Sequence, residues 1–412
     1  MKASACILSL FVLSLSHAAD LPLARQFDAT LQSRIGFDSN PTGMRDTIAA
    51  VPGDADTFSF ALGVNVGISL PARTPALPSL KLSYAGEVVR FDGCPSENYS
   101  THRLGLSGQR TIGAWKISGD ASSIFIDGSD DTLLSSAPLN ANAIPLWRER
   151  RHQWQHRLKL LTQVDRETYF LRAAGTLLDY NYQTRVAAGK IAFADRSDAQ
   201  TSFDLGWKQS ANSLWLAGVR LGRQNQAIVP LPNCAFDYSN DYVRLAAGWE
   251  GKPFANTTVT FAAGPDFRHY TGAIDPRVFL GGRARTSLWF EGNFATKLSP
   301  IVTLTGRAAR MDWLSSTGKS AYIDTGVETA LAWNLVPTWT LRLSAKVHRC
   351  DYFPARRDDW ESLLGVGATL KLSQNTVLTV DLLRHQAWNT MATLTGREFR
   401  RLAINIGVSS KL

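Results

Sequence analysis

The chain has 412 residues, a formal net charge of +9, 44% hydrophobic residues and four cysteines. Its even composition excludes a low-complexity or linker-divided protein, and the few cysteines exclude a disulfide-rich scaffold. On a secreted soluble protein this charge would indicate affinity for an acidic polymer or surface. Whether that interpretation holds depends on where the charged residues lie in the fold.

The first segment, MKASACILSLFVLSLSHAAD, has the layout of a secretory signal peptide. Lys2 supplies the positive charge, residues 7–15 form an apolar stretch, and residues 16–18 form a small-x-small cleavage site. We expect residues 1–18 to be removed and residues 19–412 to be exported by a bacterium with two membranes. Cys94, Cys234 and Cys350 then remain, and we interpret them as unrelated loop thiols of which at most one pair could form.

The remaining chain alternates apolar and polar residues with a period of two, which is typical of β-strands whose two faces meet different environments. No helical periodicity interrupts the series. The predicted strands run about 10–13 residues, against about 5–6 in soluble sheets, and a tilted membrane-spanning strand needs about 9–11. The clearest alternating segments are residues 58–70, 80–90, 153–161, 213–222, 282–294, 321–333, 339–349 and 400–412.

The connections between these strands alternate between short turns and long polar loops. This alternation is expected of a membrane barrel with periplasmic turns at one rim and exterior loops at the other. We count 19 segments, and the alternation fails between Tyr169 and Gly222, so we merge one pair and predict 18 strands, with 16 as the alternative. The predicted long loops run from residues 38 to 56, 127 to 147, 224 to 240, 266 to 281, 349 to 359 and 385 to 396.

An all-β chain can cross a bilayer only as a closed barrel, because no backbone polar group can remain unpaired in hydrocarbon. We therefore predict an all-β fold: a single closed antiparallel transmembrane β-barrel in the bacterial outer membrane, with its apolar face toward lipid. Eight Trp residues near strand ends fit interfacial girdles. They are Trp115, Trp154, Trp207, Trp249, Trp333, Trp339, Trp360 and Trp388.

The stretch QSRIGFDSNPTG lies at the end of the first predicted strand. Its GFDSNP segment, Gly36 to Pro41, resembles a motif of β-barrel porins and related uncharacterised outer-membrane barrels of bacteria. The resemblance implies fold and location. Such barrels usually end on an aromatic residue that the barrel-assembly machinery reads, and here Leu412 takes that place, in phase with the apolar face of the last strand.

The polar face of the strands carries an excess of basic residues, and a ring of Arg and Lys in an aqueous pore favours anions. We therefore predict a passive channel for small anionic or neutral hydrophilic solutes. The alternative is that these cations pair with Glu87, Asp204, Glu291, Asp324 and Glu328 and only keep the interior wet. The predicted pore-lining residues are Lys81, Arg157, Lys159, Arg283, Arg285, Arg307, Arg342, Lys346 and Arg401, and Lys371 shares their phase.

Three other functions remain open. A plugged or partner-binding barrel could serve polysaccharide export or envelope assembly, a barrel hydrolase could act at the rim, and a soluble secreted β-protein could bury the aliphatic face. We predict no enzyme, because the sequence has no GxSxG, HExxH or phosphate-binding loop and its histidines are scattered. We predict no cofactor, no metal site and no nucleic-acid partner. The expected partners are membrane lipid, the barrel-assembly machinery and small solutes, and a homo-oligomer is left open.

Overall fold

The computed structural model describes most of the chain after its first segment. The expected signal peptide, Pro41 of the motif and Cys234 lie outside the described residues. Among the residues described, no helix is long and apolar enough to cross a membrane. The described ranges are 27–40, 56–70, 79–95, 98–128, 151–183, 194–227, 237–274, 282–314, 321–352, 357–389 and 399–412.

Eighteen β-strands form one sheet in which each strand pairs antiparallel with its neighbours in sequence. The strands are β1 Phe27–Asp38, β2 Thr57–Leu70, β3 Ser79–Phe91, β4 Tyr99–Ile112, β5 Trp115–Gly128, β6 Arg151–Asp165, β7 Tyr169–Tyr182, β8 Arg196–Ser210, β9 Ser213–Gln226, β10 Asn240–Phe254, β11 Thr257–Tyr270, β12 Ala284–Ser299, β13 Val302–Leu314, β14 Ala321–Val336, β15 Trp339–Tyr352, β16 Arg357–Lys371, β17 Thr376–Asn389 and β18 Phe399–Lys411.

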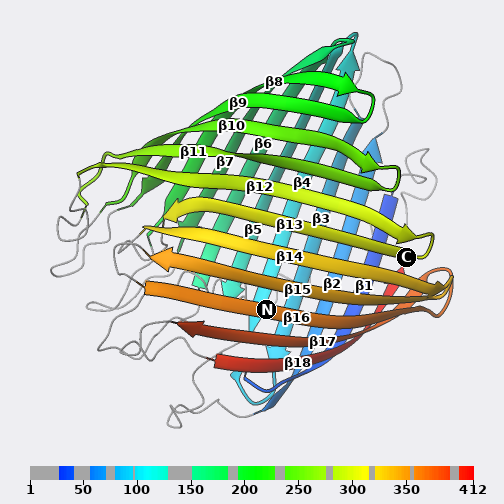
Figure 1. Ribbon diagram of the computed structural model, residues 1–412. Coiled ribbons are helices and arrows are strands. Elements are labelled where there is room, and N and C mark those ends of the chain that lie inside the picture. The colour runs from blue at the N-terminus through cyan, green and yellow to red at the C-terminus, as the bar shows by residue number, and fades with distance from the viewer. Residues whose placement is uncertain are drawn as a thin grey trace.

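The sheet closes on itself because β1 pairs with both β2 and β18. The closing register runs from Thr30 opposite Lys411 to Asp38 opposite Ala403. Figure 1 shows the result, with β8 to β18 as the near wall and the earlier strands behind them. The prediction of a closed antiparallel barrel of 18 strands is confirmed.

The two rims of the barrel differ in the length of their connections. One rim, here the short-turn rim, carries links such as 113–114, 211–212 and 337–338 as well as both ends of the sheet. The other, the long-loop rim, carries links such as 39–56, 129–150 and 227–239. Gly113 forms part of a two-residue turn and has a φ of 57°, a conformation that side chains with a Cβ disfavour.

The predicted break in this alternation was wrong. Strand β7 continues to Tyr182, β8 begins at Arg196, and the two pair directly, so residues 183–195 are one link at the long-loop rim. Three predicted loops were also placed too early, because β11, β15 and β17 continue to Tyr270, Tyr352 and Asn389. These strands extend further than the periodicity indicated, and polar residues at their ends were mistaken for loop residues.

The outer face of the barrel is apolar along its middle. On β15, Leu343 and Val347 are exposed on this face, while Arg342, Ser344 and Lys346 alternate with them on the inner face. Exposed aliphatic side chains on every side of a folded protein are unfavourable in water and favourable in lipid. The protein is therefore a β-barrel of the outer-membrane type. Its exposed outer-face residues include Leu82, Leu160, Leu205, Leu245, Leu343, Val366, Leu382 and Ile406.

Trp side chains form a belt on this outer face at the short-turn rim. They lie within two or three residues of a turn, as expected for indoles at the boundary between lipid and water. At the long-loop rim, the rings of Trp360 and Trp388 stack with centroids 6.1 Å apart. The exposed members at the short-turn rim are Trp115, Trp207, Trp215, Trp333 and Trp339.

The GFDSNP motif lies at the seam where the barrel closes. Asp38 accepts hydrogen bonds from Nε of Arg401 on β18 at 2.8 and 3.0 Å, and both side chains are buried. The Asp38 carboxylate also accepts a 3.0 Å bond from the backbone N–H of Asn40, which forms an Asx-turn. The Ser39 N–H donates to the Leu402 carbonyl at 3.0 Å. The motif thus fastens the first strand to the last.

We expect substitution of outer-face and inner-face neighbours on β15 to have opposite effects. Leu343→Arg places a charge in hydrocarbon near mid-strand and should destabilise the barrel by about 2–4 kcal/mol. Ser344→Arg, the matched control, places the same charge on the polar face and should leave stability within about 0.5 kcal/mol. Urea unfolding of both variants in lipid vesicles measures the difference, and equal losses would contradict the assignment of the two faces.

We expect the seam pair to behave as a buried ion pair. Asp38→Ala leaves the Arg401 guanidinium buried without this partner and should lower the free energy of unfolding by about 3–5 kcal/mol. The double variant Asp38→Leu/Arg401→Met removes both charges and should recover most of that loss. Unfolding midpoints of wild type, single and double variants test this. A double variant as unstable as the single would mean that the pair does not act as a unit.

Candidate functional site

The candidate site is the inner face of the barrel, which the strand register defines. Polar residues pair with polar residues from strand to strand, as with Lys159 opposite Asp120 and Lys346 opposite Glu328. Because side chains alternate along each strand, these positions face away from the exposed aliphatic residues.

Three predicted residues gather on the wall formed by β3 to β6. Lys81, Arg157 and Lys159, here called the basic wall, line a cavity of about 830 Å³ together with Asp28 and Asp120. Asp28 forms an ion pair with Lys411, with 2.6 Å between Oδ1 and Nζ. Within the described part of the chain, no ion pair involves any of the three basic-wall cations. Their charge is therefore directed into the lumen.

Two more predicted residues share a second inner cavity. Arg307 and Lys346 line a space of about 440 Å³ between β13 and β17. Glu328 stands between them in the register, opposite Arg307 on one side and Lys346 on the other. One carboxylate thus faces two cations at this level of the barrel.

Other predicted residues are engaged by carboxylates or lie outside a cavity. Arg342 donates to Asp381 at 2.9 Å, and Arg401 is held in the seam by Asp38. Arg285 faces Arg268 across the β11–β12 pairing. Arg283 precedes β12, is exposed, and lies 3.4 Å from the Thr271 carbonyl oxygen. The nine residues are therefore not one ring of equivalent charges.

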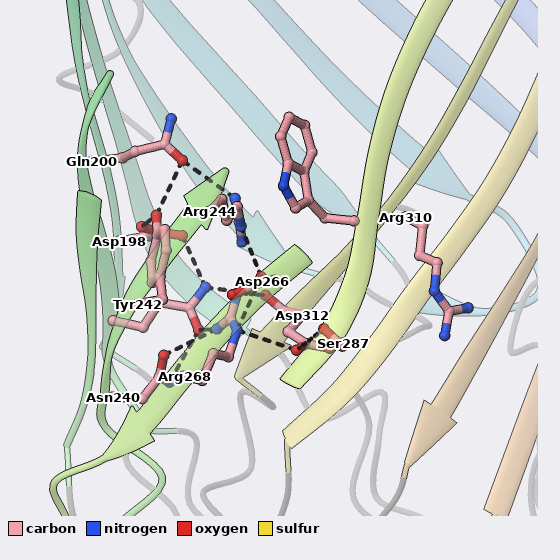
Figure 2. Close-up of polar contacts among 12 residues, drawn as sticks. Asp198, Gln200, Asn240, Tyr242, Arg244, Asp266, Arg268, Ser287, Arg310 and Asp312 are labelled. Atoms are coloured by element: carbon pink, nitrogen blue, oxygen red, sulfur yellow. Dashed lines mark hydrogen bonds and ion pairs between the residues drawn. The ribbon is translucent and has the colours of Figure 1, made fainter. Parts of the chain in front are cut away.

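The inner wall of β8 to β13 carries a dense set of polar contacts near the long-loop rim, here called the rim network. At its centre, one carboxylate oxygen of Asp266 accepts bonds from Arg244 and Arg268 at 2.8 and 2.9 Å. Asp312 accepts from Ser287 Oγ at 3.0 Å and pairs with Arg268 Nε at 3.1 Å. Figure 2 shows these side chains converging from separate strands. The network comprises Asp198, Gln200, Gln224, Asn240, Tyr242, Arg244, Asp266, Arg268, Ser287 and Asp312.

Tyr242 joins the two arginines of the network. Its ring lies 4.4 Å from the Arg244 guanidinium carbon and 4.8 Å from that of Arg268, measured to the ring centroid. Its hydroxyl donates to Asp198 at 2.8 Å. Buried charges are tolerable only when paired and hydrogen-bonded, and here each arginine has both a carboxylate and an aromatic face. The charges of this wall are therefore largely balanced locally.

The ends of β13 and β14 lean across the lumen onto this wall. Pairing of β12 with β13 stops at Phe290 opposite Arg310, whereas β13 and β14 stay paired to the end of β13. Beyond that point, the Asp312 carbonyl accepts bonds from Gln224 and Arg268 at 3.1 and 3.2 Å. The segment of residues 312–314 and 321–323, here called the β13–β14 tip, therefore narrows the lumen.

Arg196 of β8 fixes the end of the β13–β14 tip. Its guanidinium donates a hydrogen bond to the Leu314 carbonyl, although β8 and β13 are separated by four strands of the sheet. The Leu314 side chain packs in a buried cluster with Tyr238, Tyr270 and Ala321. Polar and apolar contacts thus hold the tip against the inner wall.

A proline in β11 shapes the wall below the network. Pro265 has no N–H to donate, and it lies where the β10–β11 register is interrupted, between Arg244 opposite Asp266 and Ala247 opposite Ala263. The Leu245 carbonyl instead accepts a 2.9 Å bond from the indole N–H of Trp289. A Cβ on Gly264 would lie 2.1 Å from this carbonyl oxygen, so the contact requires glycine there.

The sequence interpretation missed most of the rim network. Asp266 and Arg268 were assigned to a loop, although they alternate with exposed Phe267 in the phase of β11. On β10, Tyr242 and Arg244 show the same alternation. This alternation was the available signal, but their partners lie on strands that periodicity alone does not bring together.

Cys350 was interpreted as a loop thiol, and this was also wrong. It lies within β15, is buried, and is a free thiol beside His348. The two residues are two positions apart, which places them on the same face of the strand.

No family model and no curated protein matches this sequence. Solved outer-membrane proteins resemble it in structure. OpdK of Pseudomonas aeruginosa, solved with vanillate, is 11% identical with a TM-score of 0.42, over 94% of this chain and 99% of that one. A BenF-like porin from Pseudomonas fluorescens Pf-5 is 11% identical with a TM-score of 0.44, over 94% and 99%. OccAB3 of Acinetobacter baumannii is 10% identical with a TM-score of 0.44, over 94% and 100%. At these values the likeness is one of barrel architecture alone.

Proposed function

We propose that the protein is an outer-membrane channel for passive diffusion of small hydrophilic solutes, with a preference for anions. The observation that carries this proposal is the basic wall, whose three cations face an inner cavity without an ion pair among the described residues. Cations lining a water-filled passage lower the barrier for anions and raise it for cations. Export through the expected signal peptide and insertion by the barrel-assembly machinery belong to the same proposal.

The balance of charge across the lumen supports an anion preference. On the wall of β8 to β13, Arg244 and Arg268 are neutralised by Asp266 and Asp312. A paired wall contributes a weak field, whereas an unpaired basic wall acts over several ångströms in a confined aqueous space. In the cavity of the basic wall the three cations outnumber the two carboxylates, Asp28 and Asp120, and Asp28 is also paired with Lys411, so the net field there is positive.

The β13–β14 tip favours a second candidate function, a gated or plugged barrel. It is tied to the inner wall by side chains from β8, β9 and β11 rather than by strand pairing. Side-chain contacts can be released without breaking the barrel. In this candidate, a partner or solute at the long-loop rim would displace the tip.

We expect neutralising the basic wall to reduce anion preference. The triple variant Lys81→Gln/Arg157→Gln/Lys159→Gln should shift the reversal potential under a potassium chloride gradient toward zero, because the unpaired positive field is removed. Planar-bilayer recording measures this shift.

Matched single variants sharpen this test. Lys159→Gln should shift the reversal potential, whereas Lys116→Gln should change it little, because Lys116 is already paired with Asp165 at 2.6 Å. Equal shifts from the two lysines, or an unchanged potential in the triple variant, would contradict the assigned role of the basic wall.

We expect weakening of the tip to enlarge the passage. Asp312→Ala removes the carboxylate that binds Ser287 and Arg268, so single-channel conductance should rise if the tip narrows an open pore. If the tip plugs the barrel, wild type should be silent and the variant should conduct. Asp381→Ala, which breaks the pair with Arg342 away from the tip, is the control and should leave pore size unchanged. Identical conductance in wild type and Asp312→Ala would exclude a tip held in place by this carboxylate.

A further inference from the structure

A group of metal-ligating side chains lies on the inner face of β14 to β17, apart from the basic wall and the rim network. Asp324, His348 and Cys350 each offer one ligand atom, and these atoms all lie within 4.8 Å of one another. We propose that these three residues form a binding site for a divalent transition-metal ion of the zinc class. This inference rests on the barrel fold and not on the proposed channel function.

The strand register brings the three ligands together. Asp324 on β14 lies directly opposite Cys350 on β15, and cross-strand partners on one face have Cβ atoms only about 5 Å apart. His348 precedes Cys350 by two residues and shares its face. Opposite His348 on β14 stands Gly326, which has no side chain to occupy the space beside the imidazole.

The distances suit a small tetrahedral ion. His348 Nδ1 lies 3.2 Å from Asp324 Oδ1 and 3.8 Å from Cys350 Sγ. With bonds of about 2.0–2.1 Å to nitrogen or oxygen and about 2.3 Å to sulfur, tetrahedral geometry separates such ligand atoms by about 3.3–3.6 Å. The two separations from His348 are thus within a few tenths of an ångström of these values, and the Asp324 and Cys350 ligand atoms, which lie within 4.8 Å of each other, need at most a side-chain adjustment to close around the ion.

The donor set also points to zinc rather than to calcium or magnesium. A thiolate and an imidazole select borderline-soft ions, whereas hard ions require oxygen ligands throughout. Binding would release two protons to solvent, one from the Cys350 thiol and one from His348 Nδ1, which faces Asp324, while Nε2 keeps its proton toward Glu361.

The surroundings have the features that support metal sites in proteins. Glu361 on β16 lies 2.9 Å from His348 Nε2, on the far side of the ring from Nδ1. A carboxylate in this place fixes the ring orientation and makes the imidazole a better ligand. Cys350 packs in a buried cluster with Tyr322 and Tyr352, which shields the sulfur.

The site remains accessible from the lumen. Asp324, His348 and Glu361 line the cavity of about 440 Å³ described above, together with His385. A hydrated ion has an entry path, and water can supply a fourth ligand.

The test uses the full refolded chain in detergent micelles titrated with Co²⁺, a spectroscopic substitute for Zn²⁺. We expect one equivalent to produce a near-ultraviolet thiolate-to-cobalt charge-transfer band that one equivalent of Zn²⁺ abolishes. Cys350→Ser should lose the band, while Cys94→Ser and Cys234→Ser should retain it. A folded protein without the band, or a band that survives in Cys350→Ser, would overturn the proposal.

Two further measurements keep the proposal testable should Cys350→Ser fail to fold. Glu361→Gln should bind Zn²⁺ about 10–100-fold more weakly while keeping the charge-transfer band, because this carboxylate supports the imidazole without being a ligand. In the unmodified chain, Zn²⁺ should slow alkylation of Cys350, as measured by mass spectrometry, and a chelator should restore the rate. An alkylation rate that is insensitive to Zn²⁺ would contradict the site.

Discussion

The closure of the sheet is the constraint on which the rest of the structure depends. In hydrocarbon every backbone N–H and C=O must be paired, so an unpaired first or last strand is not tolerated. The β1–β18 register provides that pairing, and the Asp38–Arg401 ion pair reinforces it at one rim. The GFDSNP segment therefore has a structural role: it stabilises the pairing of the first strand with the last, which are far apart in sequence.

Closure in a membrane also reverses the arrangement found in soluble proteins: apolar side chains face outward, and the polar side chains of every strand face the lumen. Two parts of the inner wall differ in how their charged side chains are paired. On β8 to β13, arginines and aspartates neutralise one another and anchor the β13–β14 tip. On β3 to β6, Lys81, Arg157 and Lys159 face open space. In the proposed channel, the contrast between a paired wall and an unpaired wall, rather than the total charge, would set the preference for anions.

The period of two predicted which side chains face lipid and which face the lumen, because successive side chains of a β-strand point to opposite faces of the sheet. It correctly assigned Leu343 to the outer face, whereas the position of Cys350 inside a strand was missed, since β15 runs beyond the apolar belt into a polar rim. Contacts such as Asp38 with Arg401 could not be predicted, because they depend on closure between strands at opposite ends of the chain. Likewise, Arg196 reaches Leu314 only because the tip leaves the sheet.

Cysteine scanning along β15 distinguishes an aqueous lumen from a lipid-facing outer wall, residue by residue. Single cysteines would be introduced at each position from Leu341 to Val347, in a chain with its native cysteines replaced and reconstituted in lipid vesicles. We expect fast reaction with a charged, water-soluble thiol reagent at positions 342, 344 and 346 and protection at 341, 343, 345 and 347. Protection at every position would contradict the aqueous lumen, and reaction at every position would contradict the lipid-facing wall.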